Sequence, residues 1–267
     1  MVTSVDAVAG LVGQPTAAII VFSGCAGDAT KAAGNASAGW LIVATKTQEL
    51  KLDIERIGTV SAILTQPDNA RACYVLAHGA GAGMRHASMD KIAEGLADRG
   101  IATFRFNFPY MENKQGRPDQ PAVAHAAIRA AVEEAARLCS GMKLVAGGKS
   151  FGGRMTSQAQ SKAPLPDVKG LAFLGFPLHA DKKPSTERAE HLAHVEIPML
   201  FLQGARDGLA DLDLLKPVIA QLGPKATLHE VAGGDHSFAV LKKSGWTNEE
   251  ALAEVLDTLT AWIDELA

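Results

Sequence analysis

Residues 143–154 read KLVAGGKSFGGR, and residues 148–152 within them match the pattern Gly-x-Ser-x-Gly. We expect a strand over 143–146 and a helix from about Gly153, which leaves the serine on a sharp turn between them. Glycines two residues to either side remove the Cβ atoms that would obstruct such a turn. The hydroxyl of Ser150 would then project from the edge of a sheet above a helix N-terminus, where developing negative charge is favoured. Ser150 is therefore the candidate nucleophile.

Two nucleotide-binding patterns compete for the glycine-rich segments. Residues 148–150 resemble the end of a phosphate-binding loop, Gly-x-x-x-x-Gly-Lys-Ser/Thr, but that loop needs a glycine where the chain has Lys143. The later stretch 171–175 carries no acid that could hold magnesium. In the glycine run that begins at Gly79, Met84 stands where the dinucleotide pattern needs its third glycine. A nucleotide-binding enzyme remains one alternative, and an ordinary serine on a glycine-rich turn is another.

Beyond residue 50 the chain alternates short apolar, β-branched runs with longer alanine-rich amphipathic ones. This alternation indicates an α/β fold, with a mostly parallel central sheet flanked by helices and no large cap domain. We expect strands at 50–57, 60–65, 73–77, 101–106, 143–146, 168–174, 199–202 and 227–231. We expect helices at 88–99, 121–138, 154–162, 187–194, 212–222 and 248–266. The pattern predicts one domain, 48–267, after an N-terminal extension, 1–47, that shows no sustained period.

Two polar residues follow the last two predicted strands. Asp207 comes after the seventh strand and His236 after the eighth. A serine hydroxyl becomes a good nucleophile when a histidine removes its proton and a carboxylate orients that histidine. The chain order Ser150, Asp207, His236 is typical of α/β-hydrolases. Asp235 is the rival acid, although adjacent residues on a turn seldom face each other well enough to form the required hydrogen bond.

Negative charge that develops on a substrate carbonyl oxygen must also be met by hydrogen-bond donors. The amide of Phe151, which directly follows the serine, is one candidate. A second should come from the loop after the third strand, where His78-Gly79-Ala80-Gly81 resembles the His-Gly loops of esterases. We expect Ala80 to supply this donor, with Gly81 as the close alternative.

The composition argues against several partners. The 26 basic and 29 acidic residues leave a formal charge of -3 without a long basic run, so we expect no nucleic-acid partner. The three cysteines are dispersed and form no Cys-x-x-Cys pair. His191 and His194 lie three residues apart but have no accompanying ligand motif. We therefore expect neither a metal nor a cofactor. A homodimer is an open alternative to a monomer.

The N-terminal extension bears on localisation. No stretch reaches about 18 consecutive apolar residues, so we expect no membrane span and a cytoplasmic protein. Residues 17–22 are apolar, however, and lead into Ser23-Gly24-Cys25, which looks like a bacterial lipoprotein cleavage site. No Lys or Arg precedes them, although a secretory signal begins with positive charge. Export with processing at Cys25 is thus the minor alternative.

Five motifs together point to one family. They are Val75-Leu76-Ala77-His78-Gly79-Ala80-Gly81-Ala82-Gly83-Met84, Phe108-Pro109-Tyr110, Gly147-Gly148-Lys149-Ser150-Phe151-Gly152-Gly153-Arg154, Gly175-Phe176-Pro177-Leu178-His179 and Gly234-Asp235-His236. They resemble the dienelactone-hydrolase-like α/β-hydrolases related to a subunit of the NSL histone acetyltransferase complex. The resemblance runs from about Lys51 to the C-terminus and implies the fold and the Ser-His-Asp triad. Dienelactone hydrolases proper use a cysteine nucleophile, so Ser150 favours carboxylic esters or thioesters over lactones.

The substrate pocket is less sharply predicted. Between Phe176 and Pro198, where hydrolases often insert a lid, the segment is short and polar, which favours small soluble acyl substrates over an oil surface. Lys149 and Arg154 flank the serine, and one of them can attract a substrate carboxylate. The alternative is that each pairs with a helix-end acid or carbonyl. Gly81, Tyr110 and His179 are further candidates for the pocket lining, with packing as the alternative role of Tyr110 and His179.

These patterns predict a serine hydrolase of the carboxylic ester class that acts through an acyl-enzyme. The alternative is a catalytically idle protein-interaction module on the same fold, because fold by itself does not determine function.

Overall fold

The central element is a sheet in which eight strands are paired in the order β1-β2-β4-β3-β5-β6-β7-β8 within the described residues, 43–267, of the computed structural model. The strands are β1 (Thr45–Ile54), β2 (Gly58–Pro67), β3 (Ala72–Ala77), β4 (Ile101–Phe106), β5 (Lys143–Lys149), β6 (Val168–Leu174), β7 (Met199–Gly204) and β8 (Ala226–Val231). β2 is antiparallel to both β1 and β4, and the pairs from β4 to β8 are parallel. The parallel strands therefore end at one common edge, which is where the predicted site residues lie.

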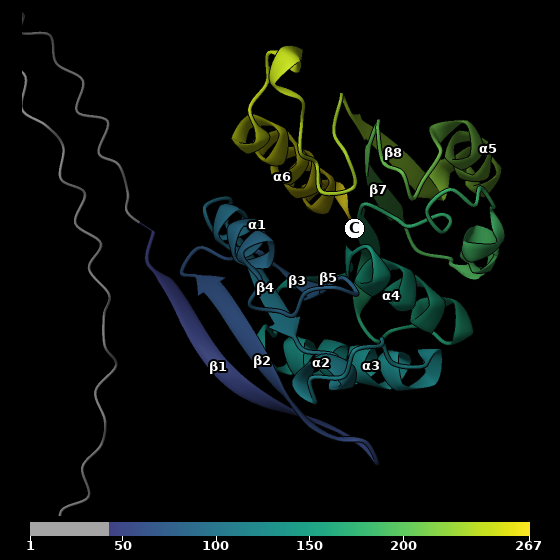
Figure 1. Cartoon of the computed structure of the whole chain (residues 1–267). Helices are drawn as coiled ribbons and strands as arrows, with labels where there is room; N and C mark the ends of the chain where they lie inside the picture. The colour runs from purple at the N-terminus through teal and green to yellow at the C-terminus, as the bar shows by residue number, and fades with distance from the viewer. Residues whose placement is uncertain (1–42) are drawn as a thin grey trace, which may run out of the picture. The chain divides into compact units, whose positions relative to one another are not determined.

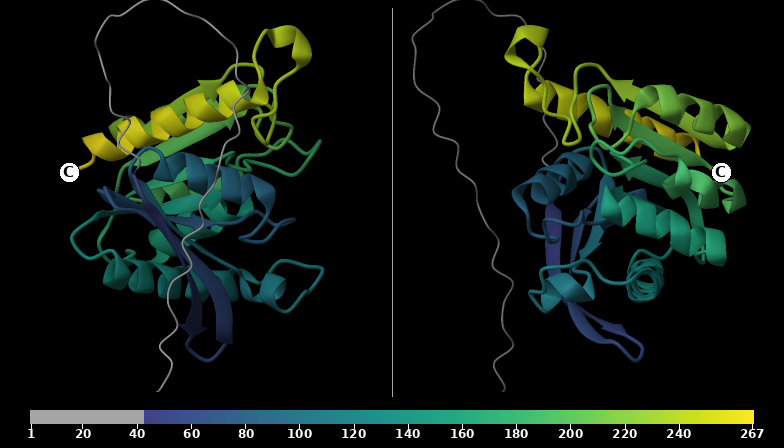
Figure 2. Two further views of the ribbon diagram at one scale, coloured as in Figure 1. Left: turned by 90° about the vertical axis from the view of Figure 1, so that its left-hand side faces the viewer. Right: turned by 45° about the vertical axis from the view of Figure 1, so that its right-hand side comes forward.

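Helices cover both faces of this sheet (Figures 1 and 2). They are α1 (Ala87–Ala97), α2 (Pro109–Glu112), α3 (Pro121–Leu138), α4 (Phe151–Lys162), α5 (Leu212–Leu222) and α6 (Asn248–Glu265), with 3-10 turns η1 (Glu187–His194), η2 (Gly223–Lys225) and η3 (Lys242–Ser244). α3, α4 and α5 pack on one face, and α1 and α6 on the other, each face having its own apolar core. This arrangement confirms the predicted α/β fold with a mostly parallel sheet, and no large cap domain is present in the described chain.

β3 and β4 are buried along their whole length, as expected when helices cover both faces of a parallel sheet. α3 faces the sheet with an alanine-rich stripe, whose small side chains let the helix approach closely. α6 begins with a capping box, in which Thr247 and Glu250 satisfy each other's backbone amides.

The predicted elements are all present, but several bounds were wrong. The first strand was expected at 50–57 and is Thr45–Ile54, because residues 55–57 form the turn of a hairpin in which Arg56 has φ 62°. This strand begins before the predicted domain start at 48. β5 runs through the glycines to Lys149, three residues beyond the predicted end. The predicted helix at 187–194 is the 3-10 segment η1.

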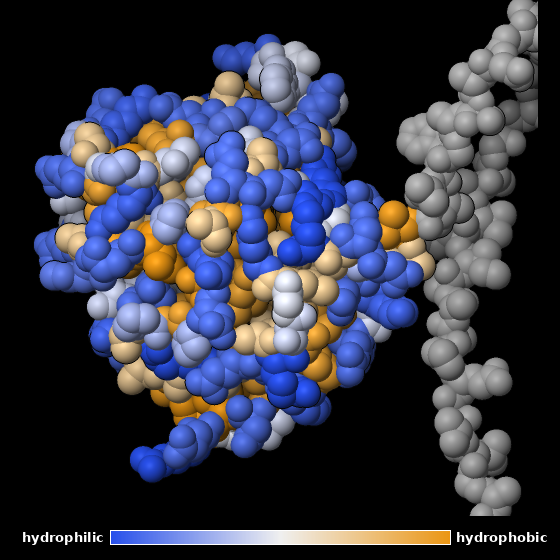
Figure 3. All heavy atoms as spheres, turned by 180° about the vertical axis from the view of Figure 1, so that it is seen from behind, coloured by the Kyte–Doolittle hydropathy of each residue, from blue (hydrophilic) through white to orange (hydrophobic). Residues whose placement is uncertain are grey.

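The surface of the described residues carries scattered apolar groups. Seen from behind, hydrophilic residues cover much of the protein, with apolar ones in patches between them (Figure 3). The large apolar side chains most exposed are Val43, Ile57, Leu241 and Trp246. Among the described residues, no helix combines the length and the hydropathy needed to cross a bilayer. The lipoprotein-like Cys25 lies outside these residues.

Candidate active site

Ser150 is the single residue between β5 and α4. It has φ 50° and ψ −114°, a strained conformation for a residue with a side chain. Gly148 and Gly152 make this turn possible, since a Cβ on either would lie 2.1 Å and 2.4 Å, respectively, from the carbonyl oxygen of Ala77 on the neighbouring strand. The predicted role of the two glycines is thus a close backbone approach.

A chain of hydrogen bonds links the three predicted residues Ser150, His236 and Asp207. Nε2 of His236 lies 2.9 Å from Oγ of Ser150, and Nδ1 of His236 lies 2.6 Å from Oδ2 of Asp207. In the tautomer that satisfies both contacts, the serine hydroxyl donates to Nε2 and Nδ1 donates to the carboxylate. The three side chains follow β5, β8 and β7, whose carboxyl ends meet at one edge of the sheet.

Asp207 is held by more than the histidine. Its side chain is fully buried. Oδ2 also accepts a hydrogen bond from Nε2 of Gln203 at 2.5 Å, and Oδ1 accepts one from the amide of Leu209 at 2.8 Å. These donors fix the carboxylate plane toward His236. Gln203 was missed by the sequence analysis, although a buried polar residue near the end of the otherwise apolar β7 was the available signal.

The rival acid, Asp235, has a different set of contacts. Its Oδ1 accepts hydrogen bonds from the amides of Ser237 at 2.8 Å and Ala239 at 3.0 Å. It therefore stabilises the loop that carries His236, while the carboxylate in contact with the imidazole belongs to Asp207.

A second serine–histidine pair lies nearby. Oγ of Ser157 is 2.7 Å from Nε2 of His191 and also donates to the carbonyl of Arg154. Ser157 is completely buried. Burial and the positive charge of Arg154 lower the pKa of His191 to about 4. A base this weak beside an inaccessible hydroxyl is poorly suited to catalysis, so Ser150 remains the candidate nucleophile.

The loop that carries Ala80 is fixed by two buried side chains. His78 accepts a hydrogen bond from the amide of Phe108 at Nε2 and contacts the carbonyl of Gly79 through Nδ1, at 3.0 Å and 2.7 Å. Burial lowers the pKa of His78 to about 4, which keeps the ring neutral. The hydroxyl of Tyr110 donates to the carbonyls of Gly79 and Ala80 at 3.2 Å and 2.9 Å. Tyr110 thus holds this loop through its hydroxyl.

A cavity of about 470 Å³ opens beside Ser150. Its lining includes Ala80, Pro118, Asp119, Pro121, Ser150, Phe151, Arg154, Met155, Pro177, Ala180, Arg188 and Leu209. Ala80, Phe151 and Arg154, which the sequence predicted for the site, all line this cavity. His179 is instead buried in its loop, where its ring contacts the carbonyl of Ala180 and the amide of Asp211. Gly81 is exposed on the loop beyond Ala80.

Two arginines share this cavity. Nε of Arg154 is buried without a hydrogen-bond partner among residues 43–267. Burial and the charge of Arg188 lower the pKa of Arg154. Arg188 reaches the cavity from η1 and donates to the carbonyl of His179 at 2.8 Å. Arg188 was not predicted, because an arginine in a polar connecting segment has no sequence signal that separates it from its neighbours.

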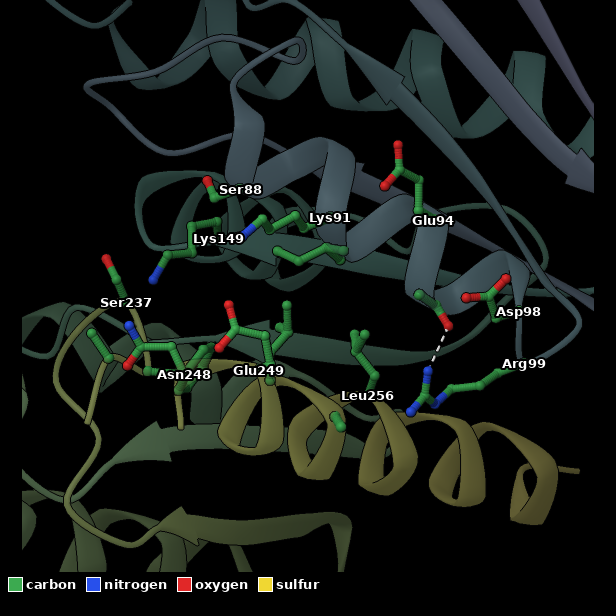
Figure 4. A pocket seen from close by; sticks show the side chains of 16 residues that line it. Ser88, Lys91, Glu94, Asp98, Arg99, Lys149, Ser237, Asn248, Glu249 and Leu256 are labelled. Carbon is green, nitrogen blue, oxygen red and sulfur yellow. Dashed lines mark hydrogen bonds between the residues drawn. The ribbon is translucent and has the colours of Figure 1, made fainter. Parts of the chain in front are cut away.

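Lys149 does not share this cavity. Its side chain lines a second cavity of about 520 Å³ on the α1 and α6 side of the sheet (Figure 4). Its amine donates to the carbonyl oxygen of His236. The expectation that Lys149 lies at the mouth of the substrate pocket is therefore wrong, because the last side chain of β5 leaves the sheet on the opposite face.

The geometry can be compared with known proteins. Residues 70–264 match the family described as Alpha/beta hydrolase domain. The chain belongs to this hydrolase family. The match to the α/β-hydrolase family covers the sheet from β3 to β8 and the loops that carry Ser150, Asp207 and His236.

Solved structures share the α/β-hydrolase fold at low identity. Dienelactone hydrolase from Anabaena variabilis is 19% identical, with a TM-score of 0.65 over 83% of this chain and 98% of that chain. An alpha-beta serine hydrolase homologue from Coxiella burnetii is 19% identical, with a TM-score of 0.64 over 80% of this chain and 96% of that one. An esterase domain of a Rhodothermus marinus protein is 16% identical, with a TM-score of 0.61 over 81% and 97%. At these identities the likeness establishes the α/β-hydrolase fold alone.

Proposed function

We propose that this α/β-hydrolase is a serine hydrolase that cleaves small acyl esters or thioesters through an acyl-enzyme. The observation that carries the proposal is the hydrogen-bonded series from the Ser150 hydroxyl through His236 to the buried Asp207. We assign this activity to the domain 48–267 and treat 1–47 as an accessory extension. We also place the chain in the dienelactone-hydrolase-like branch related to the NSL complex subunit, on the motifs given above.

In the first half of the reaction, Oγ of Ser150 attacks the substrate carbonyl carbon as its proton passes to Nε2 of His236. The carbonyl π electrons move to oxygen and give a tetrahedral oxyanion. Asp207 accepts a hydrogen bond from Nδ1 and stabilises the imidazolium that forms. The intermediate collapses, the bond to the leaving alcohol or thiol breaks, and the proton on Nε2 moves to that leaving group.

The oxyanion needs preorganised donors. Ser150 lies directly before α4, so the amide of Phe151 is the first in the helix and is free of an intrahelical acceptor. The amide of Ala80 is the second proposed donor, on the loop supported by His78 and Tyr110. Removal of one such donor typically costs about 2.7 to 4 kcal/mol in the transition state.

In the second half, a water molecule attacks the acyl carbon while His236 takes its proton. The tetrahedral intermediate expels Oγ of Ser150, which regains the proton from Nε2, and the carboxylic acid leaves. Each residue is thereby restored. The scheme uses no metal or cofactor, in keeping with the chemistry that a Ser-His-Asp arrangement supplies by itself.

The cavity beside Ser150 supports a small substrate with an anionic group. A volume of about 470 Å³ lies at the lower end of ordinary ligand sites. Arg154 and Arg188 line it, and neither forms an ion pair with an acid in the described part of the chain. Two neighbouring guanidinium groups repel each other unless an anion lies between them. A carboxylate on the acyl substrate supplies that anion and fits the planar fork of arginine.

The test is a screen of short-chain p-nitrophenyl esters, thioesters and lactones. Wild type should hydrolyse esters or thioesters, and Ser150→Ala should reduce the rate at least a thousandfold. Ser157→Ala is the matched control, because it removes the other histidine-linked hydroxyl and should retain activity. Activity that survives Ser150→Ala and disappears in Ser157→Ala would contradict the proposal.

A catalytically idle interaction module is the second candidate. A fluorophosphonate probe separates the two, since it labels an activated serine covalently. Labelling of wild type that vanishes in Ser150→Ala supports the hydrolase. A folded protein that resists labelling and cleaves none of the substrates supports the module, whereas saturable ATP binding would favour a nucleotide-binding enzyme.

A further inference from the structure

Lys149 lies directly before the proposed nucleophile but serves the other face of the sheet. Its side chain points toward the loop that carries Ser237, in the cavity between α1 and α6 (Figure 4). The two cavities have no lining residue in common. This geometry therefore gives Lys149 no direct contact with a substrate beside Ser150.

The amine of Lys149 is enclosed by the loop of His236. It donates to the backbone carbonyl of His236, and it lies 5.1 Å from the centre of the Phe238 ring. Gly175 lies beside this contact, since an added Cβ there would be 3.3 Å from the amine nitrogen and 3.1 Å from the carbonyl oxygen of His236. The amine thus joins the end of β5 to the loop after β8.

The charge of this amine has few partners. Asp207 and Asp235 favour the ammonium form through space, but among the described residues neither makes an ion pair with Lys149. Lys91 of α1 and Glu249 of α6 also line the cavity. Burial outweighs the two aspartates and lowers the pKa of Lys149 to about 8. The carbonyl of His236 is consequently its one close acceptor in the described structure.

A charge-assisted hydrogen bond is shorter and stronger than a neutral one. Here it acts on the backbone of the residue whose imidazole must stay within reach of Ser150. We propose that Lys149, in its ammonium form, is a positioning residue that holds His236 against the nucleophile. The proposal rests on the proposed serine hydrolase function, and it adds a residue that controls the geometry of the base without contacting the substrate.

The sign of the pH effect follows from the direction of the pKa shift. Below pH 8 Lys149 is charged and the loop is held. Above pH 8 it becomes a neutral amine and the hydrogen bond to His236 weakens. Activity of wild type should therefore fall as pH rises through about 8.

The experiment compares Lys149→Met, Lys149→Arg and the control Lys91→Met. Lys91 lines the same cavity, so its replacement removes an equal charge without touching His236. Lys149→Met should lower kcat about tenfold to a hundredfold with KM changed less than about twofold, the range for a lost hydrogen bond to a charged group. Lys149→Arg should recover most of the activity and lose the decline above pH 8, because arginine stays protonated. Circular dichroism checks that each variant is folded.

A second readout does not require turnover. The proton shared by Nδ1 of His236 and Asp207 gives a low-field NMR signal. In wild type this signal should broaden above pH 8. It should be weak at all pH values in Lys149→Met and should persist above pH 8 in Lys149→Arg. A signal and a kcat that are the same in folded Lys149→Met and in Lys91→Met overturn the proposal, as does an alkaline limb that Lys149→Arg retains. If no variant hydrolyses any substrate, the proposed function fails, and the NMR signal still decides the role of Lys149.

Discussion

The side-chain amide of Gln203 donates to the same oxygen of Asp207, Oδ2, that faces the imidazole of His236. Gln203 is buried and its own carbonyl oxygen, Oε1, has no hydrogen-bond partner among residues 43–267. Burial of Gln203 with an unsatisfied carbonyl oxygen costs free energy. The hydrogen bond that its amide donates explains why the residue is there, because this bond keeps the carboxylate of Asp207 turned toward His236. Two consequences for activity and stability follow from this pair.

Gln203→Leu should separate the effect of this hydrogen bond on activity from its effect on stability. The substitution removes a donor to a charged acceptor, worth about 1.5 to 3 kcal/mol, so kcat should fall roughly tenfold to a hundredfold. It also removes the unsatisfied Oε1, so the free energy of unfolding should change by less than about 1 kcal/mol. Steady-state kinetics and urea unfolding measure the two quantities. An unchanged kcat in the folded variant would show that Asp207 is oriented without Gln203.

Tyr110→Phe should impair catalysis through the Ala80 loop. Its hydroxyl donates to the carbonyls of Gly79 and Ala80, and loss of these contacts should lower kcat several-fold while destabilising the fold by about 1 kcal/mol. Tyr74→Phe is the matched control, because the buried hydroxyl of Tyr74 donates to the carbonyl of Ala172, which lies outside this loop. It should lose similar stability and keep kcat. Equal kcat losses in both variants would contradict the role of Tyr110.

Arg154→Met should change specificity more than rate. We expect kcat/KM for an ester that carries a carboxylate to fall about tenfold to a hundredfold, the effect of losing a charged hydrogen-bond donor, while a neutral ester of similar size changes less than about twofold. Arg137→Met is the control, since Arg137 pairs with Glu134 on the surface. Equal losses for the neutral and anionic esters would remove the anion-binding role.

Gly148→Ala should prevent the turn from forming. Gly148 has φ 145°, and the new Cβ would lie 2.1 Å from the carbonyl oxygen of Ala77, so we expect a loss of about 3 kcal/mol or more. Gly116→Ala is the control, because it has open space around it and should change stability by less than about 1 kcal/mol. Thermal unfolding compares them, and a Gly148→Ala protein as stable as the control would show that the turn relaxes freely.

Acid should destabilise the fold through His78. Its pKa is about 4 in the folded protein and 6.5 in a free side chain, so the unfolded chain binds the proton first as pH falls. Stability is therefore full above pH 6.5 and declines toward pH 4, by up to about 3 kcal/mol. Urea unfolding at pH 7 and pH 4.5 measures the change, which His78→Gln should reduce. An equal decline in this variant would assign the effect to other groups.

Periodicity and short motifs predicted much of the fold. The strands 101–106 and 168–174 and the helices 121–138 and 212–222 have the bounds that were expected. These elements carry a strong apolar pattern and end at proline, glycine or polar residues. The ends of β1 and β5 were missed, because hairpin geometry decides the first and glycines that read as a loop continue the second.

In the candidate site, too, some features could be predicted from local motifs and others could not. Ser150, Asp207 and His236 could be selected because each follows a strand in a recognisable motif. The contacts of Gln203, Arg188 and Lys149 depend on which face of the sheet a side chain leaves and on which loop lies opposite. The contact between Lys149 and His236 joins residues 87 positions apart, and no local pattern encodes it. The sequence therefore predicted the chemical groups better than the contacts that hold them.

The hydrogen bond between Ser150 and His236 joins residues 86 positions apart. At the usual 5–20 residues per second of protein synthesis, the histidine emerges roughly 4 to 17 s after the serine. During that interval, and until β8 has docked beside β7, the serine hydroxyl of a nascent chain lacks its base. If the proposed function holds, a newly made polypeptide is unreactive toward acyl substrates until the carboxyl-terminal half of the sheet is complete.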